Sequence, residues 1–304
     1  MDAVSQTVVW ASGAGGTCLR TLDGGATWHA VVVLGAGDLD FRSVRALDSR
    51  TAWLMSSGPG AKSRLYRTAD GGAHWSPLYT NPDAGGFFDA LAFWDARRGI
   101  LLGDPMDGQF VVLTTGDGGQ TWQRRKLPAA LPNEGAFAAS NSCLLVRGKR
   151  EVWFGTGGPS GARVFHSSNG GQDWDVAETP LRHDSAGAGI FSLAFADPLH
   201  GVAVGGDYGK PGDGSGNLAV TSDGGRTWAE PADAHPNGYR SAVAFVPRHK
   251  LWIAVGTSGS DVSRDGGRGW TRFDSGAYNA ISVSGNEAVW AVGPGGRIAR
   301  LQWP

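Results

Sequence analysis

The chain has 304 residues, 49 of them glycine, with 18% charged residues and a formal net charge of −1 at pH 7. This glycine-rich, modestly charged composition is typical of a turn-dense all-β protein and argues against disorder. The balanced charge excludes a chain-wide attraction to nucleic acid or anionic membranes. No apolar run approaches the roughly 20 residues that a membrane-spanning helix needs.

A phrase of the form Thr/Ser-x-Asp/Asn-Gly-Gly-x-x-Trp recurs six times along the chain. Successive copies lie 47, 47, 52, 54 and 42 residues apart, and such a period indicates a repeat architecture. An Asp or Asn that bonds its own backbone, followed by glycines at positive φ, predicts the corner of a β-hairpin. We therefore assign a structural turn role to six residues: Asp23, Asp70, Asp117, Asn169, Asp223 and Asp265.

Four short strand-like runs in each repeat predict the blades of a propeller. In chain order the predicted blades are residues 1–34, 39–81, 86–129, 134–181, 188–233, 238–275 and 277–304. From the second blade on, the inner strands are expected to start near Phe41, Phe88, Ala136, Ile190, Tyr239 and Tyr278. The last unit matches residues 4–22 at a constant offset of 280 and has no turn phrase. We predict one all-β domain, a seven-bladed β-propeller in which the first and last blades complete each other at ring closure.

Sequence patterns for catalysis, metals and cofactors are weak. Gly13, Gly15 and Gly16 resemble the start of a dinucleotide-binding turn, but a strand-like run follows them where that motif needs a helix. The histidines lack paired metal-ligand spacing, and Cys18 and Cys143 fall in blades that are not neighbours. We expect no catalytic residues, no metal, no cofactor and no disulfide.

The candidate site lies at the channel mouth, where the starts of the inner strands and the longer loops converge. The polar and aromatic residues expected there are Arg42, Asp89, Asp104, Asp107, Glu134, Asp207, Tyr208, Tyr239 and Arg240. Two interpretations stay open: these groups form a binding pocket, or they pair with one another and plug the channel. An acid pair such as Asp104 and Asp207 could hydrolyse a glycoside if its carboxyl groups were roughly 5–9.5 Å apart.

The repeated phrase is the Asp-box found in sialidases and other BNR-repeat proteins. Six copies and a degenerate seventh unit resemble the Ycf48/HCF136-type photosystem II stability and assembly factors, especially a non-photosynthetic bacterial branch often labelled oxidoreductase. The stretches Gly103–Gly108, Glu134–Ser140, Gly189–Phe195 and Val204–Tyr208 carry the likeness to that branch.

This resemblance implies a non-enzymatic propeller that acts as an assembly factor or scaffold and is exported across the inner membrane. We accordingly expect a periplasmic or extracellular monomer whose export signal is not among these 304 residues. Its partner would be a protein or a small polar or carbohydrate ligand, and not nucleic acid. In the photosynthetic members an arginine patch contacts the partner. The alternative is a sialidase-like glycoside hydrolase or carbohydrate-binding propeller.

Overall fold

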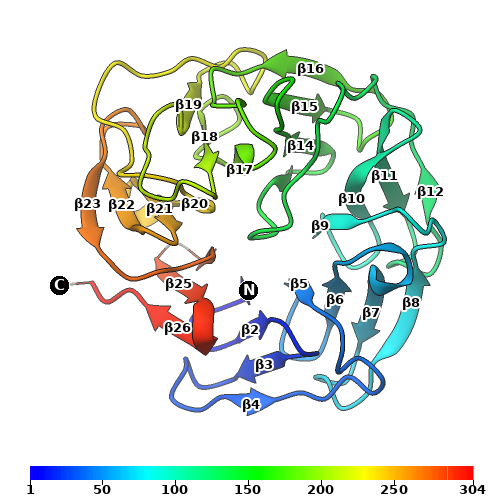
Figure 1. Cartoon of the computed structure of the whole chain (residues 1–304). Coiled ribbons are helices and arrows are strands. Elements are labelled where there is room, and N and C mark those ends of the chain that lie inside the picture. Colours follow the sequence, from blue (N-terminus) through cyan, green and yellow to red (C-terminus); the bar gives the residue numbers. More distant parts are fainter. Residues whose placement is uncertain (286, 304) are drawn as a thin grey trace.

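Seven antiparallel sheets surround a central channel in the computed structural model, which describes residues 1–285 and 287–303 (Figure 1). Each sheet is one blade, and the chain passes around the ring in order. The predicted seven-bladed β-propeller is confirmed. Within the described residues no helix is long and apolar enough to cross a membrane.

The strands of the first four blades follow the order of the chain. Blade 1 contains β1 (Asp2–Ala3), β2 (Val9–Ser12), β3 (Cys18–Thr21) and β4 (His29–Ala30), and blade 2 contains β5 (Phe41–Ala46), β6 (Ala52–Ser56), β7 (Arg64–Thr68) and β8 (Ser76–Thr80). Blade 3 contains β9 (Phe88–Phe93), β10 (Gly99–Met106), β11 (Gln109–Thr115) and β12 (Gln123–Arg124). Blade 4 contains β13 (Leu144–Arg147), β14 (Glu151–Gly155), β15 (Arg163–Ser167) and β16 (Asp175–Glu178).

The remaining blades differ in their number of strands. Blade 5 contains β17 (Ala188–Phe195), β18 (Gly201–Asp207) and β19 (Leu218–Thr221). Blade 6 contains β20 (Ala242–Val246), β21 (Leu251–Gly256), β22 (Gly259–Ser263) and β23 (Thr271–Asp274). Blade 7 contains β24 (Ala280–Ser284), β25 (Ala288–Gly293) and β26 (Arg297–Arg300). Short 3-10 turns at Gly60–Lys62, Pro247–His249 and Pro294–Gly296 complete the secondary structure.

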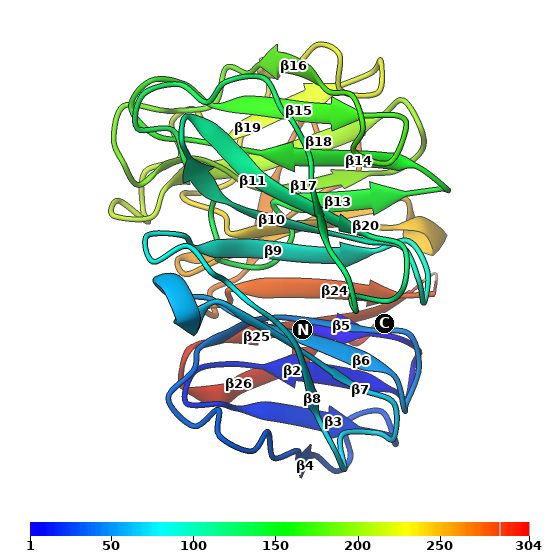
Figure 2. The ribbon, with the colours of Figure 1, turned by 90° about the vertical axis from the view of Figure 1, so that its right-hand side faces the viewer.

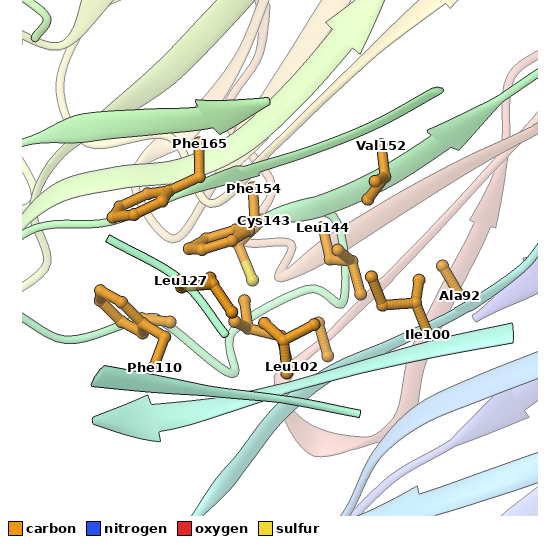
Figure 3. Close-up of a cluster of buried hydrophobic side chains, with 13 residues drawn as sticks. Ala92, Ile100, Leu102, Phe110, Leu127, Cys143, Leu144, Val152, Phe154 and Phe165 are labelled. Atoms are coloured by element: carbon orange, nitrogen blue, oxygen red, sulfur yellow. The ribbon is translucent and has the colours of Figure 1, made fainter. Parts of the chain in front are cut away.

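Apolar side chains fill the spaces between neighbouring blades. Between blades 3 and 4, for example, Phe110, Phe154 and Phe165 pack around the buried Cys143 (Figure 3). The Phe154 and Phe165 rings stack with centroids 4.5 Å apart. Because each sheet buries both of its faces in this way, the ring is held together by apolar packing between blades.

The Asp-box turns share one pattern of hydrogen bonds. Asp23 accepts bonds from the Thr27 amide and hydroxyl at 2.9 and 2.6 Å and from the Thr21 hydroxyl at 2.8 Å. Gly24 and Gly25 have φ values of 71° and 89°, which side chains disfavour. Asn169 occupies the same place and uses its amide to donate to Asp173 at 2.8 Å. These contacts account for the residue types in the phrase without a ligand.

Acid is expected to weaken these turns. Hydrogen bonds from Thr27 lower the pKa of Asp23 to about 2, and those from Thr121 lower the pKa of Asp117 to about 2. An unfolded Asp titrates near ~3.9, so their stabilisation is complete above that pH and is lost as pH falls toward 2. Urea unfolding across pH should show this loss, and T121V should move its onset to higher pH. The control T17V removes a hydroxyl that bonds a carbonyl and should not move the onset; an unchanged onset in T121V would contradict the assignment.

The first and last blades lie side by side in both views, blue against red (Figures 1 and 2). The Ala3 amide donates to the Ser282 hydroxyl at 3.0 Å, and Trp28 and Trp290 meet edge to face at 5.9 Å. The ring therefore closes between the terminal blades, as predicted. The two terminal blades are separate sheets, β1–β4 and β24–β26, that meet through their faces.

The predicted start of the blade 4 inner strand at Ala136 is wrong, because β13 begins only at Leu144. Residues 135–143 are mostly Ala, Ser and Gly, which offer little apolar surface to a sheet face. Gly135 forms an isolated bridge with Gly157, after which the segment leaves the sheet. We call residues 135–143 the plug, because of the contacts described next.

Candidate functional site

The plug crosses the channel and contacts several blades. The Asn141 side chain exchanges two hydrogen bonds with the Leu91 backbone in blade 3, at 2.8 and 3.0 Å. The Ser142 hydroxyl lies 2.7 Å from that of Ser192 in blade 5, and Arg42 in blade 2 donates to the Ala138 carbonyl at 3.3 Å. A backbone segment fixed to the walls, and not mainly ion pairs, thus occupies this part of the channel.

Two of the predicted residues are held in buried ion pairs with partners that the sequence did not indicate. The buried Glu134 carboxylate accepts bonds from Arg163 at 2.5 and 2.9 Å and from the Thr156 hydroxyl at 2.6 Å. Arg240 and Asp261 pair with both side chains fully buried. These groups fix the loops at the mouth and present no free charge to a ligand.

Asp89 and Asp104 form a pair of acids beside the plug. Burial, and secondarily the charge of Asp104, raises the pKa of Asp89 well above its usual range, and the Oδ2 atom of Asp89 has no hydrogen-bond partner. Burial also raises the pKa of Asp104, although the Ala136 amide donates to its Oδ1 at 3.0 Å. Asp104 thereby joins blade 3 to the plug.

Replacing Asp89 is expected to stabilise the protein at high pH. A carboxyl group whose folded pKa is raised favours folding below the unfolded pKa of about 4, and this contribution is lost as pH rises through the folded value. At pH 8, D89N should therefore raise the free energy of unfolding by about 1–3 kcal/mol, the range for an unsatisfied buried polar group. Urea unfolding at pH 5 and pH 8 measures this. A gain equal at both pH values, or none, would contradict a raised pKa.

The remaining predicted residues differ in exposure. Asp207 is buried and accepts bonds from the Ser185 hydroxyl at 3.0 Å and the Gly209 amide at 2.8 Å. Tyr239 is buried against Phe191, whereas Tyr208 is 60% exposed at the edge of the same aromatic group. Asp107 is an exposed turn residue with a φ of 55° in the β10–β11 hairpin. The predicted residues that are exposed and so available to a partner are Tyr208, Arg42 and Asp107.

Cavities lie on both sides of the plug. One of about 690 Å³ is lined by Asp104, Pro105, Gly157 and the plug residues from Gly135 to Phe137. The other, of about 480 Å³, is lined by Arg42, Asn279 and the plug residues Ala139 and Ser140. The plug is therefore the shared wall of two cavities at the channel mouth.

The face of the ring that carries the Asp-box turns has a basic cavity, which the sequence did not indicate. It has a volume of about 330 Å³ and is lined by Arg98, Arg125, Lys149 and Arg150, together with Asn169. The Arg125 guanidinium is anchored by the Thr114 hydroxyl at 2.7 Å. An Asp at position 169 would carry a negative charge, so the one Asn among the turn residues leaves the cavity more positive.

Chemistry that needs a metal or a reactive thiol finds little support in the described part of the chain. Its residues include no group of three or more His, Cys, Asp or Glu side chains that could hold a metal. Cys18 and Cys143 are buried and unbridged, and burial raises the pKa of the Cys18 thiol to about 12. Neither thiol is available as a thiolate near neutral pH.

Comparisons with known proteins give structural matches only. No protein-family model matches the chain, and no curated protein matches it. The chain is similar to "YCF48 bound to D1 peptide", at a TM-score of 0.69 and 17% identity, over 98% of this chain and 91% of that one. It is similar to YCF48 from Cyanidioschyzon merolae at 0.62 and 16%, over 96% and 91%. It is also similar to U3-55K at 0.62 and 15%, over 97% and 89%. The chain thus shares with Ycf48, whose family its repeats resemble, the fold of a seven-bladed β-propeller.

Proposed function

We propose that this propeller is a non-enzymatic scaffold that binds a segment of a protein partner at the channel mouth. The observation that carries the proposal is the plug, a fixed segment with a cavity on each side. A chain lying across the plug would place side chains in both cavities. The Ycf48 of similar fold is bound to a D1 peptide, which supports a peptide segment as the kind of ligand.

The chemistry of the mouth fits a segment with apolar and hydrogen-bonding groups. Asp89 is removed from solvent, and Glu134 and Arg240 are neutralised by their partners. Phe137 stacks on Phe191 at 3.9 Å, and Tyr208 extends this aromatic group to the surface. Tyrosine of this kind gives contact area and a hydroxyl at little entropic cost.

Site-specific photo-cross-linking tests the proposal. We expect a benzoylphenylalanine at position 208 to give a discrete protein adduct in the native cells, because Tyr208 is exposed at the mouth. The same probe in place of Arg226, an exposed residue of the blade 5 Asp-box turn, should give none. Equal adducts at both positions, or adducts at position 226 alone, would contradict binding at the mouth.

The basic cavity on the opposite face is the second candidate contact, since an arginine patch is what the family resemblance implies. Substitution of Lys149 and Arg150 by Glu would then weaken partner binding more than Y208A. A third benzoylphenylalanine at position 149, beside those at positions 208 and 226, tests directly whether the partner contacts this cavity.

The glycoside hydrolase alternative depends on Asp104 and a facing carboxylate. The acid that the charge of Asp104 affects here is Asp89, whose pKa it helps to raise, whereas Asp207 is bonded to Ser185 and Gly209. Burial raises the pKa of both carboxyl groups and so disfavours the ionised form that a base or nucleophile needs. A panel of aryl glycosides should show no turnover; turnover abolished by D104N would overturn the scaffold proposal.

We further propose a periplasmic or extracellular monomer. Cell fractionation of the full-length gene product tests the location, and light scattering coupled to size exclusion tests the mass. A cytoplasmic product, or a mass of two chains, would contradict these two points.

A further inference from the structure

Blade 7 lacks an outer strand, and this leaves the edge of β26 uncovered. Blades 1–4 and 6 each have a fourth strand outside the third. In blade 5 the chain covers part of this position, because Val220 and Ala229 exchange two backbone hydrogen bonds of 2.9 Å. Within the described residues no segment takes the corresponding place beside β26.

The hydrogen-bond register shows which groups face outward. The Leu301 amide donates to the Val289 carbonyl of β25 at 3.0 Å. Two residues before Leu301, Ala299 pairs with Ala291 of β25. Because bonding in an antiparallel ladder alternates with every residue, the N–H and C=O groups of Ile298 and Arg300 point away from β25. They are available to a further strand.

The sheet face next to this edge is apolar and hollow. A groove of about 150 Å³ between blades 6 and 7 is lined mainly by apolar residues, among them Val255, Phe273, Ile281, Val289, Ala299 and Leu301, with Ser260, Asp274 and Arg300 at its polar parts. Phe273 is 48% exposed there. Outer strands fill such positions elsewhere, as Val176 of β16 does against the core between blades 3 and 4.

We infer that β26 is a docking edge for an extended segment of a protein partner, with apolar residues facing the groove and acidic residues facing Arg300. Successive side chains of a strand point to opposite faces of the sheet. In the partner strand, the side chains beside Ala299 would therefore enter the groove, and the side chains between them would meet Arg300 on the other face. Arg300 lies over Trp290 at 5.4 Å and is exposed. This surface is separate from the channel mouth, so the inference does not depend on the proposed function.

Charge favours an acidic partner strand over a second copy of this chain. Both ends of β26 are exposed arginines, Arg297 and Arg300. Pairing two copies edge to edge would bring all of their guanidinium groups into one short ribbon, where like charges repel. An acidic strand instead gains a cross-strand ion pair with Arg300.

A labelled peptide can test this edge on the full chain. The probe is fluorescein-Gly-Asp-Val-Asp-Val-Asp-Val-Gly-amide, followed by fluorescence anisotropy, and we expect saturable binding below 1 mM. I298P removes an outward N–H without removing a bond to β25, and Arg297 before it has φ −62° and ψ 126°, which proline accepts. This variant should weaken binding at least tenfold with an unchanged melting temperature.

Charge and placement controls complete the experiment. R300E should lower the affinity for the acidic peptide and raise the affinity for the same peptide with Lys in place of Asp. R226E, on the blade 5 turn, should change neither affinity. If I298P does not fold, F273D, which places a charge at the groove, takes its place with the same expected loss. Three results would overturn the inference. The peptide does not saturate the protein at 1 mM, I298P or F273D binds the peptide as tightly as the unchanged protein, or the chain dimerises through this edge.

Discussion

R240M is expected to lower the free energy of unfolding by about 3–5 kcal/mol, because it leaves the Asp261 carboxylate buried without its counter-charge. Both side chains are fully buried, and Arg240 also donates to the Tyr239 carbonyl at 2.7 Å, the Ser258 hydroxyl at 2.9 Å and the Asn237 carbonyl at 2.9 Å. One guanidinium therefore holds several segments at the mouth together. Urea denaturation at pH 7 gives the value.

The controls separate a buried pair from any arginine at the mouth. R42A breaks an exposed pair with Asp40 at 2.6 Å, for which we expect a loss below about 1 kcal/mol. The double variant R240M/D261L removes both charges and should be more stable than either single variant. If R240M lowers the free energy of unfolding no more than R42A does, the Arg240–Asp261 pair is not buried in solution.

W53A is expected to destabilise the protein by about 3–5 kcal/mol, the range for deleting a large buried aromatic side chain. Trp53 is fully buried in blade 2, stacks on Phe93 at 4.1 Å and donates its indole N–H to the Gly118 carbonyl in the blade 3 Asp-box turn at 2.9 Å. It therefore joins neighbouring blades by packing and by a hydrogen bond.

A comparison of two tryptophans isolates the hydrogen bond. W53F keeps much of the stack but leaves Gly118 without its donor, and should lose about 1–3 kcal/mol. W75F is the matched control, since the Trp75 indole nitrogen is buried without a partner. Thermal unfolding should place W75F nearer to wild type than W53F. The reverse order would contradict a bonded contact between blades 2 and 3.

The ring could be predicted because its cause is local and repeated. Each turn is specified by a short phrase whose hydrogen bonds stay within about five residues, as at Asp23 and Thr27. Counting the phrases and aligning the last unit on the first sufficed to count the blades. The inner-strand starts at Phe41 and Phe88 were found in the same way.

The plug and the ion pairs could not be predicted because their causes are distant in the chain. Asn141 bonds Leu91 fifty positions earlier, and Ser142 meets Ser192 fifty later. The small residues of the plug look like a weak strand until the walls of the channel are in place. Likewise Glu134 meets Arg163 only when two loops at the blade 4 end of the mouth are brought together.

Several of the predicted site residues make buried contacts within the protein. Glu134, Asp207 and Arg240 hold loops, while Tyr208 and Arg42 remain exposed beside the plug. Asp89 is an exception, since its unpartnered buried carboxyl weakens the fold at high pH. We propose that the surface for a partner is then formed by the plug and the rims of its two cavities.

Hydrogen–deuterium exchange of the chain with and without the partner captured at position 208 tests the central claim most directly. The account predicts new protection in residues 135–143 and around Tyr208, with exchange at the Asp-box turns unchanged. Protection confined to the Asp-box turns and the basic cavity around Lys149, with none in the plug, would contradict binding at the channel mouth.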